Sequence, residues 1–243
     1  GELYMKQYLA LDLGGTYIKY ALMGDDGGFL KQGRAKSPMD SMESLMDTIQ
    51  EIGREFEGQY QGAAVSMPGR IDTKKGIAYT GGAFRFIKDA PMGQYFEERL
   101  HVPVTVVNDG KCAASAEAWS GALSDVDSGA VLVLGTGIGG GIVLNKKVWM
   151  GSTFGAGELS CFAADLAKLS EGIPDIGSEN AKAMWSSYTS TTGLLRLYAK
   201  RKGLPERGHG IDGLEFFRAY DAGEAEAVEA FEEFGRYTAA GIH

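Results

Sequence analysis

Two glycine-rich turns, each set between two apolar runs, constrain the fold of this 243-residue chain more than any other feature. The first is DLGGT at residues 12–16, and the second is GTGIGGG at residues 135–141. In both cases another apolar run follows the glycines directly, which predicts strand, turn, strand rather than strand, turn, helix. The chain therefore repeats one hairpin pattern, and this repeat favours two lobes.

Each turn has a ligand-binding and a purely structural interpretation. Glycine tolerates positive φ and has no Cβ, so backbone N–H groups can approach phosphate oxygens closely. Thr16 and Thr136 add a hydroxyl donor to each turn. A hairpin with glycines at its bend is also common in β-rich proteins. The presence of two such turns favours a nucleotide whose phosphates lie between them.

Two other nucleotide motifs fit the sequence poorly. The spacing of Gly135, Gly137 and Gly140 matches the dinucleotide fingerprint, but that motif opens a helix, whereas a strand-like run follows here. The phosphate-binding loop that ends in Gly-Lys-Ser/Thr is absent from the sequence. A hairpin-type phosphate site remains.

Charge and composition narrow the class of partner. A net charge of −8 disfavours electrostatic binding to nucleic acids or anionic membranes, so a phosphate ligand would need local hydrogen-bond donors. The sequence shows neither a leader nor an apolar run long enough to cross a bilayer, so we expect a cytoplasmic protein. Cys112 and Cys161 lie far apart and have no neighbours at metal-ligand spacing, which indicates neither a disulfide nor a zinc site.

The order of the predicted elements indicates an α/β protein with two lobes. The first lobe, residues 5–119, alternates strands with helices, and the second, residues 120–243, opens with the second hairpin and then becomes helical. The predicted strands after the first hairpin are 62–67 and 104–107, and the predicted helices are 42–56, 92–100, 112–119, 181–201, 214–220 and 225–240.

Asp109 follows the apolar strand 104–107, at the sheet edge where open α/β folds place their ligands. A carboxylate there can accept a proton from a substrate hydroxyl that attacks phosphorus, while Asn108 bonds a neighbouring hydroxyl. Asn-Asp-Gly is equally an ordinary turn and helix-cap sequence, so both interpretations stay open.

Three further charged residues also have alternatives. Asp12 lies in an apolar strand, where its carboxylate needs either a hydrated Mg²⁺ or the N–H groups of the glycine turn. Lys19 either neutralises phosphate charge or is a solvated surface residue. Glu158, which follows Gly155-Ala156-Gly157, is either a ligand-binding residue or an ordinary loop residue.

Taken together, these motifs resemble the ROK family of bacterial sugar kinases and sugar-responsive repressors. The resemblance runs from about Lys6 to the end of the chain. It implies the actin-like, hexokinase-like ATPase fold, in which two RNase H-like lobes with a cleft between them close on ATP and a sugar. Family habit also implies a homodimer.

The resemblance assigns roles to individual positions. Asp109 would be the catalytic base that deprotonates the 6-hydroxyl of the sugar, and Asp12 would position Mg²⁺ through water. The sugar would contact Asn108, Glu158, Gly82 and Ala83. The triphosphate would contact Gly14, Gly15, Thr16 and Lys19 on one side and Gly135, Thr136 and Gly137 on the other.

The sequence departs from the family pattern in three places. Glu158-Leu159-Ser160-Cys161 replaces the usual Glu-x-Gly-His, and the cysteine-rich zinc motif is missing, so we expect ATP and Mg²⁺ but no zinc. The chain also stops before the family's adenosine-binding segment. We therefore expect a hexose kinase and keep a non-catalytic sugar-binding regulator as the alternative. A DNA-binding repressor would need a helix-turn-helix ahead of Tyr8, where only a few residues stand.

Overall fold

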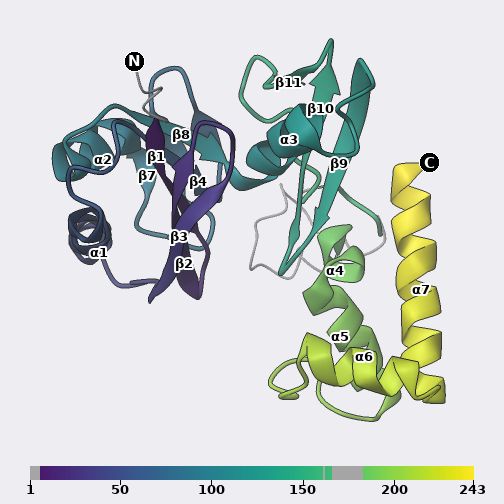
Figure 1. Cartoon of the computed structure of the whole chain (residues 1–243). Helices are drawn as coiled ribbons and strands as arrows, with labels where there is room; N and C mark the ends of the chain where they lie inside the picture. The colour runs from purple at the N-terminus through teal and green to yellow at the C-terminus, as the bar shows by residue number, and fades with distance from the viewer. Residues whose placement is uncertain (1–5, 161, 166–182) are drawn as a thin grey trace. The chain divides into compact units, whose positions relative to one another are not determined.

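A computed structural model describes residues 6–160, 162–165 and 183–243 of the chain (Figure 1). Contacts within the chain divide it into two units. Unit 1 contains the residues up to Gly129 together with Ile142–Ala156, and unit 2 contains Ala130–Gly141 together with Gly157–His243. The lobe boundary expected between residues 119 and 120 stays a prediction.

Unit 1 is built on a five-stranded sheet of order β3-β2-β1-β4-β8. Strands β1, β2 and β3 are antiparallel neighbours, whereas β1, β4 and β8 run parallel. Since parallel strands end at the same edge of a sheet, β1, β4 and β8 bring their last residues together. The strands are β1 (Gln7–Leu13), β2 (Tyr17–Gly24), β3 (Phe29–Lys36), β4 (Ala63–Met67) and β8 (Val104–Asn108).

Helices α1 (Met42–Glu55) and α2 (Met92–Leu100) pack together with the sheet in the main core of unit 1 (Figure 1). The alternation of β1 sets which side chains enter this core: Leu9, Leu11 and Leu13 are buried in it. The residues between them, including Asp12, lie on the other face of the strand. Helix α3 (Asp109–Ser120) follows β8 without a connecting loop.

A second, three-stranded sheet in unit 1 consists of β5 (Ile71–Asp72), β6 (Ile77–Thr80) and β7 (Lys88–Ala90). The sequence pattern did not predict it, because strands of two to four residues are too short to show an alternation. Strand β6 leads directly into the loop that contains Gly82 and Ala83. The small sheet therefore supports a segment that the family resemblance assigns to the sugar.

The second glycine turn joins β9 (Ser128–Leu134) to β10 (Ile138–Leu144), and β11 (Lys147–Trp149) extends the sheet in the order β11-β10-β9. The predicted succession of strand, turn and strand is confirmed. Because the division between the units crosses both strands, this hairpin contributes residues to each unit.

The rest of unit 2 is helical: α4 (Ser186–Thr189), α5 (Thr191–Arg201), α6 (Gly213–Asp221) and α7 (Ala225–Ile242). The prediction of one helix over 181–201 is wrong, and residues 181 and 182 lie outside the described residues. Ser190 is extended, with φ −94° and ψ 166°, and its side chain caps α5 by accepting the Gly193 N–H. A capping serine therefore separates two helices where the periodicity suggested continuity.

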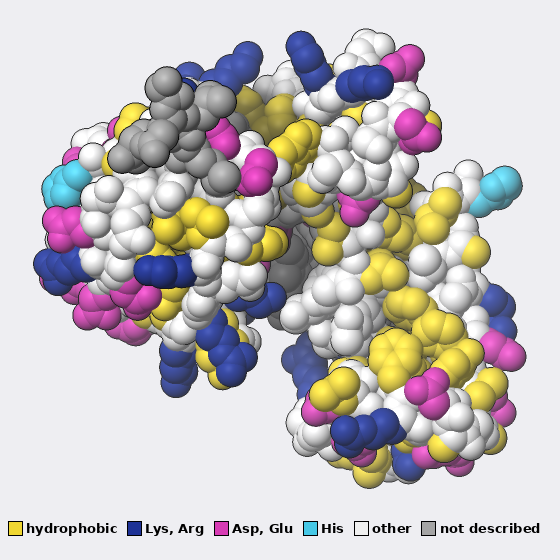
Figure 2. Space-filling model, in the orientation of Figure 1, with side chains coloured by type: hydrophobic (Ala, Val, Ile, Leu, Met, Phe, Trp, Pro, Cys, Tyr) yellow, Lys and Arg dark blue, Asp and Glu magenta, His cyan; other side chains and the backbone are white. Residues whose placement is uncertain are grey.

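The helices of unit 2 bury their own core, in which Phe216 contacts Tyr198 and Phe231. The surface of this part still carries apolar side chains, as Figure 2 shows, and Leu214 and Phe217 are among the exposed ones. Among the described residues, no helix is both long and apolar enough to span a membrane.

Candidate functional site

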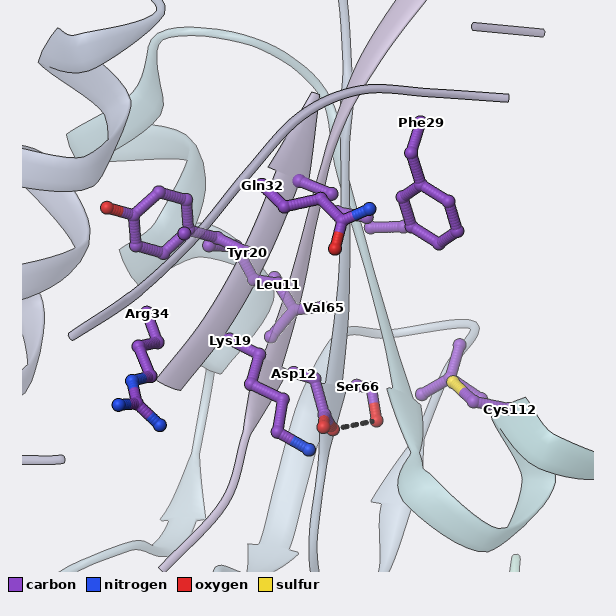
Figure 3. Close-up of a pocket in the computed structure, with 15 residues that line it drawn as sticks. Leu11, Asp12, Lys19, Tyr20, Phe29, Gln32, Arg34, Val65, Ser66 and Cys112 are labelled. Atoms are coloured by element: carbon purple, nitrogen blue, oxygen red, sulfur yellow. Dashed lines mark hydrogen bonds between the residues drawn. The ribbon is translucent and has the colours of Figure 1, made fainter. Parts of the chain in front are cut away.

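The shared edge of β1, β4 and β8 brings together polar side chains that are far apart in the sequence. Asp12 of β1 lies beside Ser66 of β4, and Met67 of β4 lies beside Asn108 of β8. The Ser66 hydroxyl donates a hydrogen bond of 3.0 Å to Oδ1 of Asp12, drawn as the dashed line in Figure 3. Sequence reasoning missed Ser66, because a lone serine in a strand carries no recognisable motif.

Asn108 is a buried helix cap. Its Oδ1 accepts the Lys111 N–H at 3.1 Å, and its Nδ2 donates to the carbonyl oxygen of Gly69 at 2.9 Å. The side chain is only 3% exposed. The capping alternative left open by the sequence is therefore realised, and sugar binding by Asn108 stays a prediction. This cap also starts α3 at Asp109, three residues earlier than the sequence pattern indicated.

Asp109 is the first residue of α3, and its side chain is exposed. Oδ1 accepts the Gly110 N–H at 2.8 Å. The first turn of a helix offers unpaired N–H groups and the positive end of the helix dipole, both of which stabilise a negative charge. The structure thus places the Asp109 carboxylate directly after β8, at the edge where β1, β4 and β8 end, and its role as a base stays a prediction.

The burial of Asp12 differs from the sequence expectation. The prediction placed its carboxylate inside an apolar strand at a large cost, but the side chain is exposed, on the face of β1 opposite the leucines. Its donor is the Ser66 hydroxyl. Lys19 is its direct neighbour across the β1–β2 pair and is also exposed.

The chemistry of the donors at this edge is compatible with Mg²⁺, since carboxylate oxygens and water are its preferred ligands. Within the described ranges, no three His, Cys, Asp or Glu side chains form a metal-binding group. A single carboxylate that holds a hydrated ion through water agrees with both observations. The Mg²⁺ role of Asp12 and the expected lack of zinc remain predictions.

The first glycine turn is tightly packed. Neither Gly14 nor Gly15 has positive φ, so the conformational reason proposed from the sequence is wrong for both. A Cβ on Gly14 would lie 2.9 Å from the Tyr17 carbonyl oxygen, and one on Gly15 would lie 3.4 Å from the Cβ of Ala83. Close packing therefore requires glycine at Gly14, whereas at Gly15 an added Cβ would make an ordinary van der Waals contact.

The same contacts decide which parts of the first turn can meet a ligand. The Gly14 N–H already donates to the Tyr17 carbonyl oxygen at 3.1 Å, while Gly15 and Thr16 are exposed. Ala83 lies beside Gly15, so the loop assigned to the sugar adjoins the turn assigned to phosphate. This loop is held in place at Gly82, whose φ is +58° and where a Cβ would lie 2.7 Å from the Pro68 Cβ.

Unit 1 also contains a cavity of about 640 Å³ that no sequence pattern predicted (Figure 3). Its lining includes the polar residues Asp12, Lys19, Arg34 and Ser66, and also Cys112 of α3. Figure 3 shows the Lys19 ammonium pointing toward Asp12. The cavity adjoins the ligand edge through the Asp12–Ser66 pair.

The thiol of Cys112 is unusually weak as an acid. Burial is the main cause that raises its pKa to about 11 from 9.0; the hydrogen bond with the Ser66 hydroxyl lowers the pKa, and the Asp109 and Asp12 carboxylates raise it. Between these two pH values the thiol is ionised in the unfolded chain but stays protonated in the folded one. This group therefore lowers the free energy of unfolding as pH rises from about 9 to about 11.

We expect Cys112 to be alkylated slowly in the folded chain. At pH 9 the thiolate fraction implies a rate about fiftyfold lower in the folded chain than in the urea-unfolded chain. Iodoacetamide labelling followed by peptide mass spectrometry measures this ratio at Cys112 alone. Equal rates in the folded and unfolded chains would contradict the burial of this thiol.

The second glycine turn, in unit 2, is open instead of packed. Gly135 and Gly137 have no positive φ. Among the described atoms, none would lie within 4 Å of a Cβ on Gly137, and one on Gly135 would meet only the Gly137 carbonyl oxygen, at 4.0 Å. Neither backbone conformation nor packing against the protein accounts for these glycines. Glycine at these positions would let a ligand approach the backbone closely, and phosphate binding at this turn stays a prediction.

A second cavity, of about 500 Å³, lies beside this turn within unit 2. Thr136 and Gly137 of the turn line it together with Thr192 and Arg196 of α5 and with Arg207. Sequence reasoning missed these α5 and loop residues, because they join the turn only through the fold. Two guanidinium groups beside a glycine turn can bind an anionic ligand, while the Glu206 carboxylate in the same lining offsets part of their charge.

Glu158 lies in unit 2 and is exposed. Its Oε1 accepts the Ser160 hydroxyl at 2.6 Å and the Ser160 N–H at 3.3 Å. This local turn holds the carboxylate in one orientation. The next position of the altered motif, Cys161, lies outside the described residues, and sugar binding by Glu158 stays a prediction.

Comparison with known proteins finds a matching family and several similar proteins. The model of the ROK family matches residues 8–243. A β-glucoside kinase of Klebsiella pneumoniae is 30% identical, over 93% of this chain and 72% of the relative. An N-acetyl-D-glucosamine kinase of Vibrio parahaemolyticus is also 30% identical, over 93% of this chain and 76% of the relative.

The fold is shared with solved structures of the same family. The structure of a ROK family glucokinase from Streptomyces griseus in complex with glucose and AMPPNP superposes with a TM-score of 0.83, at 26% identity, over 97% of this chain and 78% of that one. The predicted α/β, actin-like ATPase fold is thereby confirmed. The chain therefore belongs to the ROK family, and its relatives place it among the sugar kinases of that family.

Proposed function

We propose that this chain transfers the γ-phosphoryl group of ATP to the 6-hydroxyl of a hexose, a β-glucoside or an N-acetylhexosamine. The observation that carries this proposal is the position of Asp109, an exposed carboxylate on the first residue of α3 at the ligand edge of the sheet. There it is suited to accept the proton of an attacking hydroxyl. The substrates named for the relatives support the sugar class.

In this proposal, rigid neighbours position the sugar. The Asn108 amide is held at its nitrogen by Gly69 and at its oxygen by the first turn of α3. Its remaining hydrogen-bond donor and acceptor positions therefore have one fixed orientation. The loop at Gly82 and Ala83 forms a further wall beside the first glycine turn. Glu158 binds another ring hydroxyl. Such fixed contacts align the reacting oxygen with phosphorus.

The triphosphate is assigned to the two glycine turns. Gly15 and Thr16 contact one side, Gly135, Thr136 and Gly137 contact the other, and Lys19 contributes positive charge. Gly14 shapes the first turn, because its own N–H is already engaged. Asp12 holds the hydrated Mg²⁺, which offsets phosphate charge when bound. The open space beside Gly135 and Gly137 supports this assignment.

A coupled assay of ADP release, with Mg-ATP and a panel of hexoses, β-glucosides and N-acetylhexosamines, tests the proposal. We expect ADP release that depends on one class of sugar. Calorimetry with the same panel separates the alternative, a sugar-binding regulator. Sugar binding without any ADP release would reject the kinase and favour that regulator.

A further inference from the structure

The first turn of α5 is bonded to the second glycine turn by consecutive contacts within unit 2. The Thr191 N–H donates to the Gly135 carbonyl oxygen at 2.8 Å, and the Thr192 hydroxyl donates to the Thr136 carbonyl oxygen at 2.8 Å. A longer contact of 3.5 Å joins the Thr191 hydroxyl to the Leu134 carbonyl oxygen. Three successive carbonyl groups therefore face α5.

The direction of these carbonyl groups matters for an anion. A carbonyl oxygen carries partial negative charge and repels phosphate, whereas an N–H group binds it. In a planar trans peptide, C=O and N–H point in opposite directions. By holding the carbonyl oxygens of Gly135 and Thr136, the helix therefore aims the N–H groups of Thr136 and Gly137 away from α5.

These two N–H groups are available to a ligand. Across the described part of the chain, no protein acceptor takes a hydrogen bond from the N–H of Thr136 or of Gly137. The space beside Gly137 is also open, as no described atom lies within 4 Å of its ideal Cβ position. Two adjacent N–H groups aimed to one side of an open turn form a small anion-binding concavity.

The Thr192 hydroxyl is not required to form the helix itself. Ser190 caps α5 by accepting the Gly193 N–H at 3.0 Å. Thr192 is exposed, so its side chain contributes little to the core. The hydrogen bond to Thr136 therefore acts on the turn and not on the folding of α5.

We propose that Thr192 is a positioning residue for nucleotide binding: its hydroxyl holds the peptide between Thr136 and Gly137 so that the Gly137 N–H faces the phosphates of ATP. This inference rests on the proposed function and adds a residue that lies outside both glycine motifs. Without the hydroxyl, the peptide can rotate and turn its carbonyl oxygen toward the phosphates.

The test compares Thr192→Val, which removes the hydroxyl at nearly constant shape, with Thr192→Ser, which keeps it. Calorimetry measures binding of Mg-AMPPNP and, separately, of the sugar identified by the ADP-release panel. We expect Thr192→Val to weaken nucleotide binding about fivefold, the usual effect of one lost hydrogen bond, with sugar affinity unchanged. Thr192→Ser should restore nucleotide binding.

Thr238→Val is the matched control, since the Thr238 hydroxyl also donates to a backbone carbonyl oxygen at 2.8 Å, that of Phe234 in α7. It should leave nucleotide binding unchanged. If Thr192→Val binds the nucleotide as tightly as the wild-type chain does, or Thr192→Ser fails to restore binding, the positioning role is wrong. If the wild-type chain binds no nucleotide, both this inference and the proposed function fail. Thermal melting of Thr192→Val itself shows whether any loss of binding arises from unfolding instead.

Discussion

Replacing Asp109 by asparagine should lower the turnover number about a thousandfold, because the amide cannot accept the proton of the attacking hydroxyl. The change preserves local structure: an asparagine Oδ1 can still accept the Gly110 N–H that Asp109 binds at 2.8 Å. Sugar affinity should therefore stay within a few fold of wild type. The coupled assay gives the turnover number, and calorimetry gives the affinity.

Asp26→Asn is a suitable control for this experiment. Asp26 is another exposed carboxylate of unit 1, and its Oδ1 also accepts a backbone N–H at 2.8 Å, from Gly28. It lies in the turn between β2 and β3 and should be replaceable without loss of turnover. If Asp109→Asn retained wild-type turnover, the role of Asp109 as the base would be disproved.

The second large effect is expected from Gly69→Ala, in the loop after β4. Gly69 has φ +108°, and a Cβ there would lie 2.0 Å from the Thr80 carbonyl oxygen. Strained backbone and overpacking together should lower the free energy of unfolding by about 3 kcal/mol. Since the Gly69 carbonyl also accepts the Asn108 amide, the shift should displace Asn108 and weaken sugar binding.

Urea unfolding of Gly69→Ala and Gly58→Ala separates the clash from the strain. Gly58 also has positive φ, +74°, but an added Cβ there would meet nothing within 4 Å. Gly58→Ala should therefore cost only about 1 kcal/mol and leave sugar affinity unchanged. Equal losses in the two variants would show that the contact between Gly69 and Thr80 is unimportant.

Elements with strong local patterns were predicted well from the sequence. Both glycine hairpins formed, and the helices predicted at 92–100 and 214–220 correspond to α2 and α6. In α2 the apolar periodicity matches the buried face, whereas in α6 Phe216 is buried but Leu214 and Phe217 are exposed. In both segments the local pattern was still enough to predict that a helix forms. The motifs that revealed the ROK family are of the same local kind.

Elements that depend on distant contacts were not predicted. The short strands of the small sheet form only because they pair with one another, and the break at Ser190 interrupts a helical pattern at a capping side chain. The environment of Asp12 was also wrong in the prediction. An apolar strand sequence does not show which of its faces is left uncovered.

The sequence by itself determined the family, the α/β class and the positions of both glycine turns, because each is encoded in a run of adjacent residues. Only the tertiary structure decided how tightly each turn is packed and which distant residues contact it. It showed that packing requires glycine at Gly14, whereas no described atom crowds the Cβ positions of Gly135 and Gly137. It also placed Ser66 beside Asp12 and Thr192 beside Thr136, pairs separated by 54 and 56 positions. Such contacts depend on strand register and helix docking, which no local pattern specifies.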